Sequence, residues 1–259
     1  MNREEKQKLY KVRWYVRQKW AEPSAKEEVL DLLSNLLDPE SAPSNRPSVS
    51  GENQKLLWCP FAQMDFRPAV TRGAYQNGYP KGAIVHFTAG RRSGLTSGLD
   101  YQVDQGHLYF LIEEDGNIGQ NFPLDSWGYH AGPSSYPGLN GTVSDDLVGI
   151  EIQCAGKLRK EGSRYFSWYG EQIPVAQVRS ISSQTANQEA GHYHKYTDAQ
   201  EDALKKLLVW LTRNNTDTFK VDYIVGHDEV SPRRKNDPGG SLSTPMPELR
   251  ETVKALARA

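Results

Sequence analysis

A histidine, a lysine and an aspartate lie within one short polar turn near the C-terminal end of the chain, in the segment GHDEVSPRRKNDPG (residues 226–239). The apolar residues 223–225 lead into this turn, and its prolines and glycines allow the chain to fold back. His227 and Asp237 can then face one point, which is half of a metal site. A catalytic zinc ion takes three protein ligands and keeps a fourth position for water. A third ligand must therefore come from elsewhere in the chain.

His86 is the candidate for that third ligand. It lies inside the apolar run IVHFT (residues 84–88), which is typical of a buried central strand. A buried imidazole needs a polar partner, and a backbone carbonyl or a metal ion satisfies it. For a histidine considered alone, a hydrogen-bonded core position is the more common outcome. The second set of polar residues in the 226–239 turn favours the metal.

Four segments of the chain resemble the zinc-dependent N-acetylmuramoyl-L-alanine amidases. This family includes phage lysozyme-type amidases, cytoplasmic amidases of cell-wall recycling and the peptidoglycan recognition proteins. The order and rough spacing of the segments agree, and the resemblance extends from about residue 81 to the C-terminus and back to about residue 56. The segments are IVHFT (84–88), YHAG (129–132), VGIEI (148–152) and the GH and RKNDPG ends of 226–239.

The resemblance implies that His86, His227 and Asp237 bind Zn²⁺. Two neutral imidazoles and one carboxylate leave the site with a net positive charge, which lowers the pKa of a bound water toward about 7. Such a site suits attack on an amide. Some relatives use a cysteine as the third ligand, but the two cysteines here, Cys59 and Cys154, lie far from position 237 in the sequence.

Glu151 lies in the strand-like run LVGIEIQ (147–153), where alternation places Gly149, Glu151 and Gln153 on one face. The resemblance implies that Glu151 is a general base, which takes a proton from water and later delivers it to the leaving amine. Burial would raise its pKa and a zinc ion would lower it. From the residues alone, an exposed glutamate on a solvated sheet face is the simpler interpretation.

Lys235 precedes Asp237 by two residues, so an extended turn can direct both side chains to the same side. The resemblance implies an electrophilic role for Lys235, because an ammonium group stabilises the oxygen charge of a tetrahedral intermediate. Arg234 matches an arginine of the recycling-type relatives and is expected to grip a carboxylate of the stem peptide. A solvated basic loop is the alternative for Arg234.

The loop SWGYHAGP (126–133) contains Trp127 and His130, both expected to contact substrate at the rim of the cleft. His130 is assigned to substrate because a fourth protein ligand would close the open metal position. His192 and His194 are spaced for a second metal site on a strand. Their segment (180–195) is polar and lacks an apolar period, which favours two exposed loop histidines. His107 is expected in a turn.

Global properties are typical of a globular enzyme. The chain has 259 residues and a formal net charge of −1, which excludes strong attraction to nucleic acid. No run of 18 apolar residues predicts a membrane span, and the N-terminus lacks a secretory signal core. We expect synthesis in the cytoplasm without a cleaved signal. The protein would then act on the cell wall after phage-type or secretion-type release, or stay in the cytoplasm as a recycling enzyme.

The predicted organisation has three parts. Residues 1–38 carry helical apolar spacing on either side of Pro23 and predict an N-terminal helical hairpin. Residues 39–55 have a linker composition rich in Pro, Ser and Asn. Residues 56–259 form the catalytic domain. The hairpin could pack on that domain, bind the wall or a partner protein, or mediate self-association, and its sequence favours none of these roles.

The predicted fold of residues 56–259 is α/β, with a mixed central β-sheet flanked by helices. Residues 108–112 and 118–122 predict a hairpin around Asp115-Gly116-Asn117. Apolar stripes predict one helix after Thr197 or Asp198 and another beginning at Pro247. Residues 156–195 form an insertion with clustered aromatics, expected either as one wall of the cleft or as a surface loop.

Together these observations predict a zinc amidase that hydrolyses the bond between N-acetylmuramic acid and L-alanine in peptidoglycan, as a cell-wall lysin. Two alternatives remain open. One is a recycling amidase that acts on soluble muropeptides. The other is a peptidoglycan-binding module without catalysis, for which a broken set of metal ligands would be expected; here every ligand position is filled.

Overall fold

The computed structural model describes residues 56–67, 70–90, 94–139, 142–184 and 188–258, all within the unit Lys55–Ala259. The helical hairpin predicted for 1–38 and the linker predicted for 39–55 lie outside the described residues, and both stay predictions. Within the described ranges, no helix is both long and apolar enough to cross a lipid bilayer.

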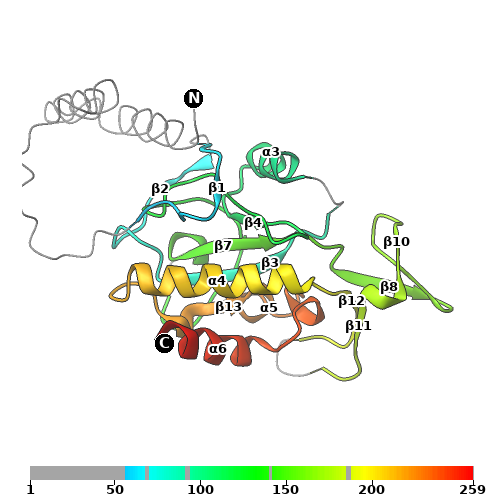
Figure 1. Cartoon of the computed structure of the whole chain (residues 1–259). Helices are drawn as coiled ribbons and strands as arrows, with labels where there is room; N and C mark the ends of the chain where they lie inside the picture. The colour runs from blue at the N-terminus through cyan, green and yellow to red at the C-terminus, as the bar shows by residue number, and fades with distance from the viewer. Residues whose placement is uncertain (1–55, 68–69, 91–93, 140–141, 185–187, 259) are drawn as a thin grey trace, which may run out of the picture. The chain divides into compact units, whose positions relative to one another are not determined.

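The core of this unit is a six-stranded mixed sheet (Figure 1). All neighbouring strands run parallel except β4 and β5, which form the antiparallel hairpin predicted from the sequence. The predicted mixed α/β architecture is confirmed. In spatial order the strands are β1 (Gln63–Met64), β5 (Ile118–Gln120), β4 (Phe110–Ile112), β7 (Leu147–Ile152), β3 (Gly82–Phe87) and β13 (Ile224–Gly226).

Two long helices, α4 (Asp198–Asn214) and α6 (Met246–Arg258), cover one face of the sheet (Figure 1). Buried side chains of both helices pack in one cluster with Val148, Ile150 and Ile152 of β7; they are Leu204, Leu207, Leu208 and Leu211 of α4 and Leu249 and Val253 of α6. The period of the stripe on α4 is that of an amphipathic helix whose apolar face meets a sheet. Of the two cap residues that the sequence offered, Thr197 caps α4, and Gln200 completes a capping box.

The opposite face of the sheet carries the shorter helix α3 (Leu95–Gln105), where Leu95 and Leu99 pack on Leu111 of β4. Neighbouring residues of β4 point to the other face, since Phe110 and Ile112 belong to the cluster under α4. The same alternation on β7 sends Gly149 and Glu151 to the α3 side. The sheet therefore presents polar chemistry on one face and an apolar core on the other.

The described residues between 156 and 195 form a second sheet, where the sequence offered a cleft wall or a surface loop. It has five antiparallel strands in the order β10-β9-β8-β12-β11. The expectation of loop histidines at 192 and 194 was wrong, because both lie in β12. Tyr193 of β12 is fully buried and packs against Gly239 and Gly240. These partners are distant in sequence, so the local apolar pattern does not predict that this segment is buried. The strands are β8 (Lys157–Glu161), β9 (Arg164–Phe166), β10 (Gln172–Ile173), β11 (Val178–Ile181) and β12 (Gly191–His194).

Short elements complete the unit. These are the strand pair β2 (Gly73–Ala74) and β6 (Ser126–Trp127), the four-residue helix α5 (His227–Val230), and the 3₁₀ turns η2 (Val143–Asp145), η3 (Val175–Gln177), η4 (Val221–Tyr223) and η5 (Gly239–Ser241). Both cysteines are buried free thiols, as expected for Cys154.

The packing of α4 on the sheet gives a stability prediction. Leu207 is fully buried in the main core, so Leu207→Ala removes apolar contacts and leaves a cavity. We expect a loss of about 2–5 kcal/mol in the free energy of unfolding, measured by urea denaturation. Leu256→Ala on α6 is the matched control, because that side chain is 45% exposed and its removal should cost little. Equal losses in the two variants would contradict the assignment of this core.

Candidate active site

Two segments that are distant in sequence, strand β3 and the 226–239 turn, bring His86, His227 and Asp237 together. His86 is the fifth residue of β3, and His227 follows directly after β13, the parallel neighbour of β3. The backbone N–H of Asp228 donates to the carbonyl of Asp237 at 2.8 Å and closes the turn between α5 and η5. This bond holds Asp237 next to His227, at the start of the turn. The predicted fold-back of 226–239 is therefore present.

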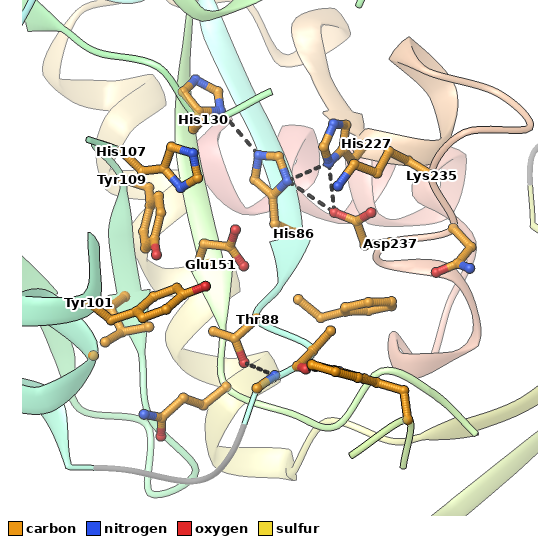
Figure 2. A pocket seen from close by; sticks show the side chains of 18 of the residues that line it. His86, Thr88, Tyr101, His107, Tyr109, His130, Glu151, His227, Lys235 and Asp237 are labelled. Atoms are coloured by element: carbon orange, nitrogen blue, oxygen red, sulfur yellow. Dashed lines mark hydrogen bonds and ion pairs between the residues drawn. The ribbon is translucent and has the colours of Figure 1, made fainter. Parts of the chain in front are cut away.

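The three side chains converge on one point (Figure 2). The Nδ1 atoms of His86 and His227 lie 2.9 Å apart, and Asp237 Oδ2 lies 3.0 Å from the first and 2.9 Å from the second. All three residues are at least 95% buried. They are also the one set of His, Cys, Asp and Glu donors in the described ranges that is grouped closely enough to hold a metal ion.

Hydrogen bonds on the far side of each ring determine where the ring protons lie. His227 Nε2 is 2.9 Å from the carbonyl of Ala131, and His130 Nε2 is 2.9 Å from that of Leu147, so both Nε2 atoms must donate. A neutral imidazole has a single N–H, so the Nδ1 atom of each of these rings carries a lone pair. His130 Nδ1 then accepts from His86 Nε2 at 3.1 Å. This leaves a lone pair on His86 Nδ1 as well.

Three acceptors therefore face one another without a proton between them. Burial, and secondarily the neighbouring His227, lowers the pKa of His86 to about 4, so that ring stays neutral at pH 7. Burial raises the pKa of Asp237, but the two adjacent imidazoles outweigh this effect and hold that pKa below its usual value. A cation satisfies all three acceptors at once. Two imidazole nitrogens and a carboxylate oxygen are a donor set that zinc prefers.

Glu151 pairs with His86 in the register of the adjacent strands β7 and β3. Its Oε2 atom is buried and has no hydrogen-bond partner among the described residues. Burial, and then the charge of Asp237, raises the pKa of Glu151 to about 8, although Lys235 opposes the shift. The predicted alternation of β7 is confirmed, and it places an unpaired carboxyl group beside the three acceptors.

Lys235 lines the same pocket, and Figure 2 shows its side chain extending toward His227 and Asp237. Its positive charge contributes to lowering the pKa of His86 and that of Glu151. An ammonium group in this position can stabilise negative charge that develops on an oxygen near the three acceptors.

The remaining three predicted site residues have other surroundings. His130 lines the pocket but uses both ring nitrogens within the protein, and it packs over Gly149, where a Cβ atom would lie 2.8 Å from the ring. The guanidinium of Arg234 donates to the carbonyls of Ala131 and Pro133, at 2.8 Å each, and so braces that loop. Trp127 packs edge-to-face on Tyr129 and is not among the residues that line the pocket.

The pocket has a volume of about 990 Å³ and includes residues that the sequence reading did not select. His107 and Tyr109 belong to this group, and so do Tyr101 of α3 and Trp168 of the second sheet. The alternation that predicts strand 108–112 also places residues 107, 109 and 111 on one side, so two of these were within reach of the sequence. Trp168 belongs to the 156–195 insertion that the sequence offered as one wall of the cleft. Tyr101 was not within reach, because only the tertiary fold brings α3 to the pocket.

Metal loading should raise thermal stability through these three ligands. A divalent ion at 100 times its dissociation constant stabilises the folded state by about 2.7 kcal/mol, or roughly 5–10 °C in Tm for a unit of this size. We expect zinc to produce this shift in calorimetry and EDTA to reverse it. His86→Ala should abolish the shift, whereas His192→Ala, which removes a histidine of the second sheet, should keep it. A zinc response that survives in His86→Ala would contradict the site.

The chain is similar to several known proteins. The Escherichia coli K12 amidase AmiD is 26% identical over 176 residues, which span 65% of this chain and 53% of AmiD. The chain thus spans about half the length of that curated relative. Among solved structures, a crystal structure of an AmpD derivative has 21% identity and a TM-score of 0.48, covering 75% of this chain and 96% of AmpD. The Clostridium intestinale endolysin LysCS has 17% identity and a TM-score of 0.46, covering 76% of this chain and 98% of LysCS.

A protein-family profile described as N-acetylmuramoyl-L-alanine amidase matches residues 76–240, more than half of the chain. These residues include both histidines of the acceptor cluster, its aspartate, Glu151 and Lys235. The resemblance read from the motifs is thereby confirmed, and the chain belongs to the N-acetylmuramoyl-L-alanine amidase family.

Proposed function

We propose that this protein hydrolyses the amide bond between the lactyl group of N-acetylmuramic acid and L-alanine in peptidoglycan or its soluble muropeptides. The observation that carries the proposal is the convergence of three buried acceptors beside an unpaired buried carboxyl group, within a segment that matches the amidase family. The pocket of about 990 Å³ is large enough for a sugar and part of a peptide.

His86, His227 and Asp237 are the residues that would hold zinc. A bound zinc ion supplies Lewis acidity and lowers the pKa of water, which yields a nucleophile near neutral pH. The three ligands are anchored by backbone bonds and by His130, so they are preorganised for an ion and require little rearrangement.

Glu151 is proposed as the general base and then the general acid. It accepts a proton from the attacking water as oxygen bonds to the lactyl carbonyl carbon. It returns that proton to the alanine nitrogen as the C–N bond breaks, which gives a carboxylic acid and a free amine. A pKa raised by burial suits a group that must both take and give a proton near neutral pH.

Lys235 is proposed to stabilise the carbonyl oxygen as it gains negative charge. The ammonium group lies in the same pocket as Glu151 and approaches the acceptor cluster from the 234–237 turn. Stabilisation of a charge that exists only on the way to the transition state raises kcat and leaves KM nearly unchanged.

Glu151→Gln should keep the metal and lose turnover. The amide is close in size to the carboxylate but accepts no proton, so we expect kcat to fall on the order of 10²–10⁴-fold. The measurement is mass spectrometry of products from soluble muropeptides and from purified wall, with zinc content determined in parallel. Glu251→Gln on α6 is the control. A Glu151→Gln protein with normal turnover would rule out this base.

The same assay tests the reaction itself and its context. Stem peptides with a free L-alanine amine, released by the wild-type protein, establish the amidase. Release from intact wall favours the lysin, and release from soluble muropeptides alone favours a recycling enzyme. If the zinc-loaded protein binds wall and releases nothing from either substrate, the binding module is the better explanation.

Lys235→Met should reduce kcat about 10²–10³-fold, the range found when one oxyanion donor is removed. Zinc content and KM should stay close to those of the wild type. Lys254→Met on α6 removes an exposed ammonium of the same kind and should have no effect on kcat. A rise in KM with unchanged kcat would instead assign Lys235 to ground-state binding.

A further inference from the structure

Trp168 is an exposed aromatic side chain at the lip of the active-site pocket. It lies in the turn between β9 and β10 of the second sheet, is 75% exposed, and lines the pocket that contains Glu151. A large apolar ring in this position is open to water unless a ligand covers it. The proposed roles of the zinc ligands, of Glu151 and of Lys235 do not involve Trp168.

Hydrogen bonds hold this exposed ring in place. The indole N–H of Trp168 donates to the carbonyl of Ala89, and the hydroxyl of Tyr169 donates to that of Gly90 at 2.9 Å. The two rings also pack edge-to-face, with centroids 5.6 Å apart. A side chain that is exposed and fixed has already lost much of the conformational entropy that binding would cost.

The backbone that receives the indole bond is itself in an unusual conformation. Ala89 has a φ of 46°, in the left-handed region that non-glycine residues seldom adopt. Such a conformation persists where surrounding contacts hold it, and it is frequent at ligand-binding segments. Ala89 follows His86 by three residues, so their Cα atoms are at most about 11 Å apart. The Trp168 contact therefore lies close to the reacting centre.

The second sheet is also bonded to the turn that carries Asp237. Arg179 of β11 donates to the carbonyls of Gly240 and Ser241, at 3.1 and 2.9 Å, and Tyr193 of β12 packs on Gly239 and Gly240. The insertion is thus attached both to the segment that follows His86 and to the segment that follows Asp237. This attachment gives the β9–β10 tip a fixed position relative to the acceptor cluster.

We propose that Trp168 is the platform of a subsite for a sugar ring of the substrate, with Tyr101 of α3 as a second exposed aromatic in the same pocket. The inference rests on the proposed function. The muramic acid ring is joined to the scissile carbonyl through the lactyl group, so it must lie within a few bonds of the centre.

The chemistry of the surrounding lining fits a pyranose. Among the described residues that line the pocket, the acidic and basic side chains are confined to β7 and the 234–237 turn. The lining also provides the hydroxyl of Ser97 and the side-chain amide of Gln153, the residue after β7, whereas the hydroxyl of Thr88 is already bonded to the backbone of Cys154. Neutral hydrogen-bonding groups around a flat ring suit sugar hydroxyl and acetamido groups, whereas a stem peptide with free carboxylates favours cations.

The first test uses a ligand without a peptide. Tryptophan fluorescence of the full-length protein is titrated with the disaccharide N-acetylglucosaminyl-N-acetylmuramic acid. We expect saturable binding by the wild type, loss of the signal with Trp168→Phe, and on the order of tenfold weaker binding by Trp168→Ala in calorimetry, the scale of one aromatic contact. Val175→Ala, an exposed apolar residue of the same insertion outside the pocket, is the matched control.

The second test is kinetic and uses soluble muropeptides. Trp168→Ala should raise KM on the order of tenfold and leave kcat and zinc content near wild-type values, and Trp168→Phe should restore most of the loss in KM. Unchanged disaccharide affinity and unchanged KM in Trp168→Ala would overturn the sugar subsite. A change in KM without any change in disaccharide affinity would also overturn it, because it would assign the ring to the stem peptide.

The two proposals fail in different ways. If the wild type binds the disaccharide through Trp168 and cleaves nothing, the subsite is supported and the amidase reaction is refuted. If the wild type cleaves muropeptides and Trp168 has no influence on sugar binding, the reaction is established and the subsite is refuted.

Discussion

The structure depends on one electrostatic constraint: three buried acceptors meet at one point and share no proton. The protons of the imidazoles are committed to the far side of the rings, to backbone carbonyls for His227 and to His130 for His86. Neighbouring lone pairs repel each other in a medium of low dielectric constant, so a bound cation would stabilise the arrangement. The hydrogen bonds on the far side of the rings hold this geometry. Each one directs a lone pair inward.

The sheet provides the rigidity that such a site requires. Parallel pairing of β3 with β7 and β13 puts His86 beside Glu151 and near His227, at the same edge of the sheet. The apolar faces of these strands are fixed by α4 and α6, so the polar residues are free of any packing role. Gly149 of β7 has no side chain, and this leaves room for the His130 ring that bonds to His86. Small errors in position are costly at a metal centre, and strands are more rigid than loops.

The second sheet contacts both segments of the chain that carry the proposed metal ligands. Through η5 it supports the turn that ends in Asp237, and through Trp168 and Tyr169 it contacts the segment that follows His86. An insertion that contacts both ligand-bearing segments can shape what enters the pocket without changing the reacting groups. Under the two proposals, substrate recognition and the reacting groups are located on different parts of the fold, as is common in enzymes whose loops vary on a fixed scaffold.

The sequence by itself determined the family, the mixed α/β class, the alternation of β7 and the grouping of the two histidines with Asp237. These features follow from strand periodicity, turn residues and short motifs, which depend only on residues close together in the sequence. Only the tertiary structure decided the orientation of each ring nitrogen, the internal bonds of Arg234 and His130, and the sheet formed by residues 157–194. Those outcomes depend on partners far away in sequence: the Ala131 carbonyl for His227, and the glycines of η5 for Tyr193. The direction of each Nδ1 lone pair depends on the hydrogen-bond partner of Nε2 in the same ring, and only the tertiary fold brings that partner into place.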